Sequence, residues 1–396
     1  MSVANRFLRY ISYDTQSNEE STTIPSTAKQ WELSNQLYKE CLSLFDHVEQ
    51  GNDGIVYATL NATKADDSIG FLAHMDTATE ISGARVEPQM IRDYDGQSIT
   101  LKNGLVIDPD IYPVLKTCIH DDLIVTNGNT LLGGDDKAGI AIILTAIEQI
   151  RSLPHGKICV AFTVDEEIGR GTDTFDLQKF PVDYAYTIDG DRIDNVEYEN
   201  FNAAQATITI KGTAIHPGEG KDKLVNASLL AMDFAHCIPH NQTPAHTQGR
   251  EGFFHLLKLE GDVAKAKMVY IIRDHDATKF ARKKALMNNV VDALNDKYGQ
   301  RFSIEMHDQY HNMAEFMTDK TPVNRAKKAM ARCGLEAVSI PIRGGTDGAM
   351  LSEKGLACPN LGTGTFLHHG PREFASLSKM AQMVEILVQI IKGEGI

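Results

Sequence analysis

Short apolar runs that end in acidic or histidine residues constrain the fold of this chain more than any other feature. Residues 68–76, 157–164 and 184–188 have the length and apolar content of buried strands, and residues 135–151 place apolar side chains on one helical face. Strands that alternate with helices predict an α/β sheet covered on both faces. In such sheets, ligand sites form just beyond the strand ends.

Polar motifs fall at these strand ends and at the start of the helix. They are His74-Met75-Asp76, Gly134-Asp135-Asp136-Lys137, Asp165-Glu166-Glu167, Ile188-Asp189-Gly190 and, further along, His368-His369-Gly370. Histidines and carboxylates together suit a pair of divalent metal ions, zinc most readily, with one carboxylate left for acid–base chemistry. Each motif alone has an ordinary explanation, so the prediction rests on the set.

The first two motifs illustrate these alternatives. Residues i and i+2 of a strand share a face, so His74 and Asp76 can lie side by side, one on a metal ion and the other orienting it. A core histidine near a surface aspartate is the alternative. Asp135 opens a helix after two glycines, where the helix N-terminus stabilises a carboxylate. Asp135 or Asp136 could equally be an ordinary cap of that helix.

The remaining motifs are as ambiguous when taken singly. Glu166 and Glu167 follow a buried strand, and if both are extended they point opposite ways, one toward metal and the other toward substrate as a base. A solvated acidic turn is the alternative, although adjacent acids repel one another unless a cation lies nearby. Taken alone, Asp189 and His369 are each better explained as ordinary turn or surface residues.

Composition and charge limit the partners. A chain of 396 residues is too long for one ordinary core, so two domains are expected. The formal net charge of −14 argues against nucleic acid and anionic membranes, which need a basic face. No apolar run reaches the length of a membrane span or a signal-peptide core. The six cysteines are far apart and indicate free thiols in a reducing compartment, so we expect a cytoplasmic protein.

The middle of the chain has a different rhythm of elements. We expect strands at 203–212, 252–260, 266–273 and 302–308, with helices at 225–238 and 276–298. Their order, β-α-β-β-α-β, is the ferredoxin-like pattern. This pattern predicts a second, smaller domain within the chain.

The predicted domains are therefore discontinuous. We expect residues 1–204 and 318–396 to form the domain that carries the polar motifs, and residues 205–317 to form the inserted one. After the insertion, the chain returns to α/β character with a helix at 320–333, a strand near 337–342 and a helix at 375–392.

Three further motifs offer groups that could bind a substrate. His216-Pro217-Gly218 and Arg273-Asp274 fall in the inserted segment, and Arg343-Gly344-Gly345-Thr346-Asp347-Gly348 follows it. An arginine fork suits a carboxylate, and glycines let the backbone approach a ligand closely. A turn or a surface ion pair accounts equally well for each motif.

Taken in order, the motifs resemble those of the dinuclear zinc exopeptidases. The matching stretches are His-Met-Asp-Thr, Gly-Gly-Asp-Asp-Lys-Ala-Gly, Asp-Glu-Glu-Ile-Gly-Arg-Gly, Ile-Asp-Gly, His-Pro-Gly, Ile-Arg-Asp, Arg-Gly-Gly-Thr-Asp-Gly and His-Gly. Pro25-Ser26-Thr27, Phe201-Asn202-Ala203-Ala204 and Gln309-Tyr310-His311-Asn312-Met313 extend the resemblance over almost the whole chain. The family also holds carboxypeptidase G and the aminoacylases, and this chain resembles its tripeptide aminopeptidases most.

The resemblance implies a fold, a cofactor and an oligomer. The expected fold is a zinc-exopeptidase catalytic domain, with a mixed sheet between helices, plus an inserted ferredoxin-like α+β domain that serves as a lid and often as a dimer interface. We therefore expect a homodimer through the inserted domain. The implied cofactor is two Zn²⁺ ions per subunit, which Mn²⁺ or Co²⁺ could replace in a carboxylate-rich site.

The resemblance also implies a role for each site residue. The metal ligands are Asp135 as the bridge, His74 and Asp189 at one ion, and Glu167 and His369 at the other. His369 is preferred to His368 because the family histidine directly precedes a glycine. Asp76 would orient His74, and Glu166 would be the general base.

Four residues are implied as substrate contacts. His216 would help hold the scissile carbonyl or the oxyanion, from its own or a partner subunit, and Arg273 would grip the peptide carboxylate. Asn226 and Arg343 are weaker candidates. The implied activity is release of the N-terminal residue from short unblocked peptides, chiefly tripeptides, through a water activated by two zinc ions.

Alternatives and departures remain. The same site could serve a dipeptidase or an N-acyl-amino-acid amidohydrolase, and a more remote alternative is a non-catalytic metal-dependent peptide-binding protein. The stretch from Gly362 to His369, and Asp191 after Asp189-Gly190, depart from the family pattern. Both departures concern the rim of the pocket, so they affect the expected substrate preference more than catalysis.

Overall fold

A computed structural model of the chain describes residues 1–393. The chain divides into two compact units. The larger comprises Met1–Tyr198, Phe316–Ile340 and the segment from Thr346 onward, and the smaller comprises Glu199–Glu315 and Pro341–Gly345. Within the described residues, the two units share no β-sheet.

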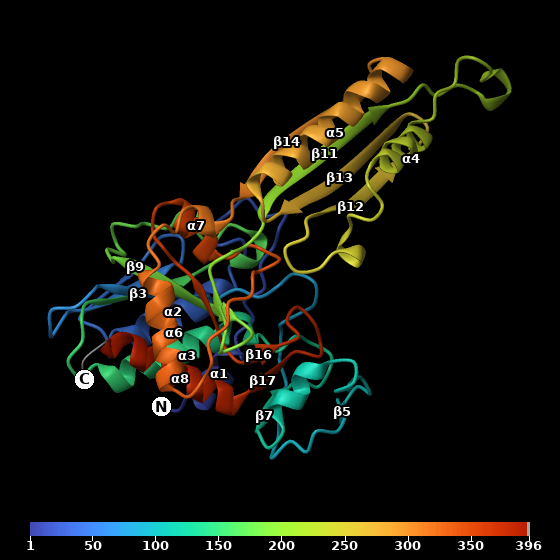
Figure 1. Ribbon diagram of the computed structural model, residues 1–396. Coiled ribbons are helices and arrows are strands. Elements are labelled where there is room, and N and C mark those ends of the chain that lie inside the picture. Colours follow the sequence, from blue (N-terminus) through green and yellow to red (C-terminus); the bar gives the residue numbers. More distant parts are fainter. Residues whose placement is uncertain (394–396) are drawn as a thin grey trace. The chain divides into compact units, whose positions relative to one another are not determined.

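A seven-stranded mixed sheet organises the larger unit (Figure 1). Its strands, in spatial order, are β1 (His47–Gln50), β2 (Val56–Leu60), β8 (Ile158–Thr163), β3 (Ile69–His74), β9 (Tyr184–Gly190), β15 (Asn360–Gly362) and β10 (Val196–Glu197). The four neighbours from β8 to β15 are parallel, and the outer strands are antiparallel. Every side chain of β3 and β8 is buried, as expected for parallel strands covered on both faces.

Six α-helices lie in the part of this unit that the structure describes. They are α1 (Val3–Tyr10), α2 (Gln30–Cys41), α3 (Gly134–Ile150), α6 (Thr321–Arg332), α7 (Asp347–Glu353) and α8 (Leu377–Lys392). Helix α3 is buried along almost its whole length and packs against β3, β9, α1 and α8. Its first residues therefore lie close to the end of β3, where the polar motifs begin.

A second, smaller core lies beside this sheet. Four short strands form it, β16 (Thr365–Phe366), β17 (Phe374–Ser376), β7 (Leu123–Val125) and β4 (Gln89–Ile91), together with the hairpin β5 (Ile99–Thr100) and β6 (Val106–Ile107). Tyr94, Leu115, Phe366 and Phe374 fill its interior. Strands of two or three residues carry too little periodicity to be recognised from sequence, so this sheet was not predicted.

The smaller unit has the predicted ferredoxin-like arrangement. Its antiparallel sheet has the order β12 (Phe253–Gly261), β13 (Lys265–Asp274), β11 (Asn202–Lys211) and β14 (Phe302–Tyr310). Helices α4 (Ala227–Cys237) and α5 (Ala277–Tyr298) run alongside these strands (Figure 1). An apolar core joins helices and sheet, with Ile208, Met268, Phe234 and Met287 among its fully buried members. The predicted fold class is therefore confirmed.

Two details differ from the sequence prediction. The prediction of a strand near 337–342 is wrong, because this segment forms only a single bridge, between Val338 and Asn195. Pro341 has no N–H group to donate to a neighbouring strand. The unit boundaries also lie a few residues from the predicted ones. Asn202 already pairs with Asp274, and the main-chain N–H of Ile342 donates to Glu199, so that residues 341–345 belong with the smaller unit.

Among the described residues, none of the helices combines the length and the apolar content needed to cross a bilayer.

Candidate metal centre and active site

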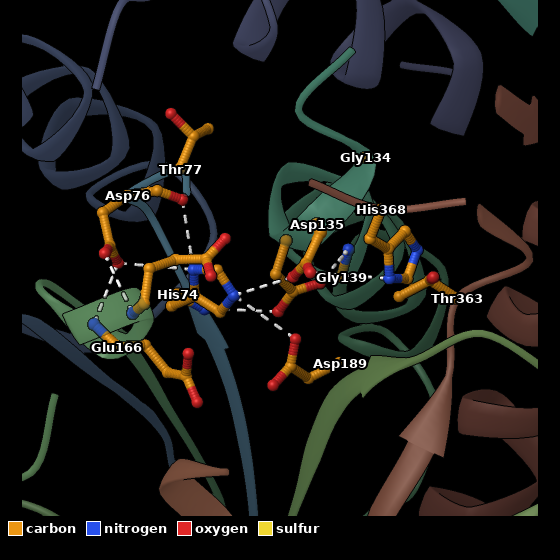
Figure 2. Close-up of polar contacts among 12 residues, drawn as sticks. His74, Asp76, Thr77, Gly134, Asp135, Gly139, Glu166, Asp189, Thr363 and His368 are labelled. Atoms are coloured by element: carbon orange, nitrogen blue, oxygen red, sulfur yellow. Dashed lines mark hydrogen bonds and ion pairs between the residues drawn. The ribbon is translucent and has the colours of Figure 1, made fainter. Parts of the chain in front are cut away.

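The parallel strands bring the polar motifs to one edge of the large sheet. His74 ends β3, Asp189 lies near the end of β9, and Glu166 follows β8 by three residues. Because β8, β3 and β9 are parallel neighbours, their carboxyl ends meet. Asp135 joins them from the start of α3, and Figure 2 shows the four side chains turned toward one another.

His74 uses its two ring nitrogens differently. Its Nε2 lies 2.9 Å from Asp135 Oδ1 and 3.3 Å from Asp189 Oδ1. Its Nδ1 lies 3.3 Å from Asp76 Oδ1 and 3.1 Å from the Asp76 carbonyl oxygen. One nitrogen thus faces the carboxylate cluster while Asp76 holds the other (Figure 2).

Asp76 also ties the end of β3 to the acidic turn after β8. Its carboxylate accepts hydrogen bonds from the main-chain N–H groups of Glu166 and Glu167, each at 3.1 Å, and from the Ser17 hydroxyl at 2.6 Å. One buried carboxylate therefore positions His74 and both glutamates at once.

The expectation that Glu166 and Glu167 are extended is wrong. They open a 3₁₀ turn, Glu166–Ile168, and Asp165 before them adopts a left-handed conformation with φ of 56°. Ser26 and Gln30 hold the Asp165 carboxylate, which makes 2.7 Å, 2.5 Å and 2.6 Å hydrogen bonds to the Ser26 N–H, the Ser26 hydroxyl and the Gln30 amide. This anchoring gives the Pro25-Ser26-Thr27 stretch a structural role.

Asp135 lies between the two imidazoles. Its Oδ1 faces His74, and its Oδ2 lies 3.3 Å from Nε2 of His369. The same His369 nitrogen is 3.0 Å from Glu167 Oε2. Two groups of three residues each place candidate ligand atoms within 4.8 Å of one another. One group is His74, Asp135 and Glu167, and the other is His74, Glu166 and Asp189. A carboxylate with one oxygen toward each imidazole has the disposition needed to bridge two ions.

The two neighbouring histidines differ in their surroundings. His368 shares a hydrogen bond of 2.9 Å with the Thr365 hydroxyl and lies 3.5 Å from Asp135, next to which Figure 2 shows it. His369 reaches both Asp135 and Glu167 with one nitrogen. The second arrangement is the one that would let an imidazole join carboxylates around an ion.

Electrostatics at this edge favour a cation. Burial raises the pKa of Glu166 well above its usual value, and it raises the pKa of Glu167 to about 7 and that of Asp189 to about 6. Burial opposes protonation of His74, but the carboxylates of Asp189 and Asp135 raise its pKa well above 6.5. Glu167 Oε1 is buried and has no hydrogen-bond partner among the described residues. Nitrogen and oxygen donors with surplus negative charge fit divalent metal ions such as zinc.

Sequence reasoning missed one carboxylate that builds this site. Buried Glu373 accepts hydrogen bonds from four successive N–H groups, those of Leu132, Gly133, Gly134 and Asp135, at 2.7–3.1 Å. Glu373 therefore fixes the loop that presents Asp135. No local signal links positions 238 residues apart.

Asp136 and Asn360 have similar supporting roles. Asp136 Oδ1 caps α3 by accepting from the Gly139 N–H at 3.0 Å, and its Oδ2 accepts from the His74 N–H at 3.2 Å. The alternative of a helix cap thus applies to Asp136. Asn360 accepts from the N–H of Asp189 and donates to the partly buried Glu197 at 2.7 Å.

The four predicted substrate contacts all lie in the smaller unit and form two separate pairs. Arg273 pairs with Ala203, one step from one end of the β11–β13 ladder, and the other end is Lys211 with Lys265. His216 lies in the segment after that second end that the Thr213–Val225 bridge closes, and Asn226 directly follows the bridge. Eight residue steps of about 3.4 Å place Arg273 about 27 Å from that second end.

Each pair has its own surroundings. Arg273 is buried, packs over the Tyr310 ring and donates to the Ala204 and Ile272 carbonyls. Arg343 donates to the Gly249 carbonyl and the Thr247 hydroxyl, so it holds the 247–251 loop. Exposed His216 accepts from the Gly218 N–H, and Asn226 caps α4.

Comparison with known proteins decides the family. The sequence model of peptidase family M20/M25/M40 matches residues 128–393. The chain belongs to this family. It is 48% identical to peptidase T of Desulfitobacterium hafniense (strain Y51), over 99% of this chain and 98% of that protein.

Solved structures share the fold. The aminopeptidase PepT from Bacillus cereus superposes with a TM-score of 0.78 at 23% identity, over 98% of this chain and 97% of that one. The Bacillus subtilis YXEP protein, described as a dinuclear metal binding peptidase of family M20, superposes with a TM-score of 0.66 at 14% identity, over 98% and 96%. The predicted resemblance to tripeptide aminopeptidases is confirmed by the match to peptidase T, and the chain is a peptide-bond hydrolase of the M20/M25/M40 family.

Proposed function

We propose that this chain is a metal-dependent aminopeptidase that releases the N-terminal residue from short unblocked peptides, chiefly tripeptides. The observation that carries the proposal is the convergence of His74, Asp135, Glu167, Asp189 and His369 at one sheet edge, in a chain 48% identical to a peptidase T. Free cysteines at all six positions support a cytoplasmic location.

These residues would hold two Zn²⁺ ions. Asp135 would be shared between them, with His74 and Asp189 on one and Glu167 and His369 on the other. When bound, the ions supply Lewis-acid polarisation of the peptide carbonyl and a nucleophilic water at neutral pH. Mn²⁺ or Co²⁺ could occupy the same carboxylate-rich ligands.

Glu166 is the proposed general base. Asp76 accepts the Glu166 main-chain N–H and so fixes where this residue leaves the sheet. Burial, with Asp189 nearby, raises the pKa of the Glu166 carboxyl and so favours its holding a proton. Glu166 would take the proton of the attacking water and return it to the leaving amine.

The substrate contacts support a homodimer. A tripeptide spans at most about 11 Å, whereas Arg273 lies about 27 Å from the far end of the β11–β13 ladder. Arg273 and His216 therefore could not both contact one tripeptide from the same subunit. We assign the peptide carboxylate to Arg273, with Arg343 beside it, and His216 and Asn226 to the site of a partner subunit.

Matched peptides test the proposal. Unblocked di-, tri- and tetrapeptides of the same composition are incubated with the enzyme, with and without a chelator and subsequent zinc. We expect preferential release of the N-terminal residue from tripeptides, lost on chelation and restored by zinc. Cleavage confined to dipeptides or N-acyl amino acids would overturn the substrate, and metal loading without hydrolysis would favour a binding protein.

A further inference from the structure

Glu80 is a carboxylate beside the candidate metal ligands, and the proposed chemistry does not use it. Its Oε1 lies 3.2 Å from Nδ1 of His369. The opposite nitrogen of that ring, Nε2, lies 3.3 Å from Asp135 and 3.0 Å from Glu167. The imidazole thus stands between a single carboxylate and the cluster.

His74 has the same arrangement. Its Nε2 faces Asp135 and Asp189, and its Nδ1 faces Asp76 at 3.3 Å. Asp76 and Glu80, which face the Nδ1 atoms of His74 and His369, lie four positions apart in the segment that follows β3. One short stretch of chain therefore supplies the outer partner of both histidines.

The chemistry of imidazole explains why such a partner matters. A neutral imidazole carries one N–H, and its other nitrogen is the one that can bind a metal ion. A carboxylate that accepts the N–H at Nδ1 leaves the lone pair at Nε2, orients the ring and makes it a stronger ligand.

We propose that Glu80 is a positioning residue for His369, as Asp76 is for His74. This inference rests on the proposed function, because it requires His369 to be a metal ligand. His369 has a left-handed backbone with φ of 60° and a side chain that is 42% exposed, so its own surroundings restrain it less than those of buried His74. An external partner is accordingly more important for it.

Glu80 and Asp76 differ in what else they hold. Asp76 is buried and also accepts from Ser17, Glu166 and Glu167, so its replacement would disturb the whole edge. The Glu80 side chain is 59% exposed, so its replacement leaves the fold intact. Loss of Glu80 therefore affects the ion on His369 and spares the ion on His74.

Zinc titration of metal-depleted full-length protein, in competition with a chromophoric chelator, tests this. Wild type, Glu80→Ala, Glu80→Gln and the control Glu87→Ala are compared, since Glu87 is an exposed acid of the same segment that pairs with Lys102. Glu80→Ala is expected to bind one ion as wild type does and the second at least about 10-fold more weakly. Glu80→Gln should be intermediate, because its amide oxygen still accepts the N–H, and Glu87→Ala should match wild type.

The outcomes separate the inference from the proposed function. If wild-type protein binds fewer than two ions, the proposed function fails, whatever the variants do. If wild type binds two and Glu80→Ala binds both equally well, the role of Glu80 is overturned. Unchanged zinc affinity with a raised KM confined to peptides with a free N-terminus would also overturn it, in favour of contact with the substrate ammonium.

Discussion

The large sheet buries acids and imidazoles at its edge, whereas the small sheet buries hydrocarbon. In the larger unit, His74, Asp135 and Glu167 share one pocket of ligand atoms. In the smaller unit, the face beneath α4 and α5 is apolar, with Ile208 and Met268 fully buried. Burying charge opposes folding unless a cation offsets it, while apolar burial stabilises directly. The contrast agrees with the proposed function, in which the larger unit supplies the metal ligands and the general base.

The largest expected effect is a loss of kcat on replacement of Glu166, the proposed general base. Glu166→Gln removes the proton acceptor but leaves the proposed ligands, so kcat should fall about 10²- to 10⁴-fold while zinc content stays at the wild-type level. Steady-state kinetics on a tripeptide and metal analysis of the same sample measure both quantities. Near-normal turnover would refute the assignment of Glu166.

Truncation in the apolar core should have the opposite profile. Ile208→Ala should destabilise the smaller unit by about 2–5 kcal/mol, because it leaves a cavity under α4 and α5, without changing zinc affinity. Hydrogen exchange of the β11 amides reports the stability of this unit. Thr207→Ala on the half-buried opposite face is the control, expected within about 0.5 kcal/mol of wild type. A change of zinc affinity in Ile208→Ala would contradict the view that the core of the smaller unit and the metal site of the larger unit are independent.

Replacement of Arg273 should weaken binding of the substrate, because its guanidinium is the proposed partner of the peptide carboxylate. Its loss removes a charge-assisted hydrogen bond of about 1.5–3 kcal/mol, so Arg273→Ala should raise KM for tripeptides about 10-fold or more. C-amidated tripeptides should be affected far less, and the exposed Arg250 offers a control substitution. Equal effects on free and amidated peptides would refute the contact with the carboxylate.

The smallest effect is a pH response of opposite sign in the two units. Burial raises the pKa of Glu197 to about 7 in the larger unit and lowers that of His275 to about 4 in the smaller one. Folded Glu197 binds its proton more tightly than the unfolded chain, so its contribution to stability is lost as pH rises from about 4.5 through 7. Neutral His275 acts the other way, and its contribution is lost as pH falls from about 6.5 through 4.

Hydrogen exchange of the metal-free protein at pH 5 and pH 7, corrected for intrinsic exchange rates, separates these effects. Protection of the β11 and β13 amides should be lower at pH 5, and His275→Phe should remove that difference. Protection of the β9 and β15 amides should be lower at pH 7. A common response of both sheets would contradict the assignment.

Much of the fold and of the candidate site could be predicted, because the sequence patterns that indicate them are local. The buried strands before His74 and Asp189 and the β-α-β-β-α-β order of the inserted unit all follow from periodicity within short windows. The features that the sequence did not predict depend on contacts between residues far apart in the chain. The turn at Glu166 is held by Ser26 from far along the chain, and the Asp135 loop is held by Glu373. Neither carboxylate–backbone arrangement leaves a pattern near its own position.

Anomalous X-ray scattering at the zinc edge, from crystals of the zinc-loaded protein, tests the central claim most directly. The account predicts two zinc peaks, each about 2.0–2.2 Å from a different carboxylate oxygen of Asp135. One ion should lie against His74 and the other against His369. A single peak, or peaks that leave Asp135 uncoordinated, would contradict the dinuclear site.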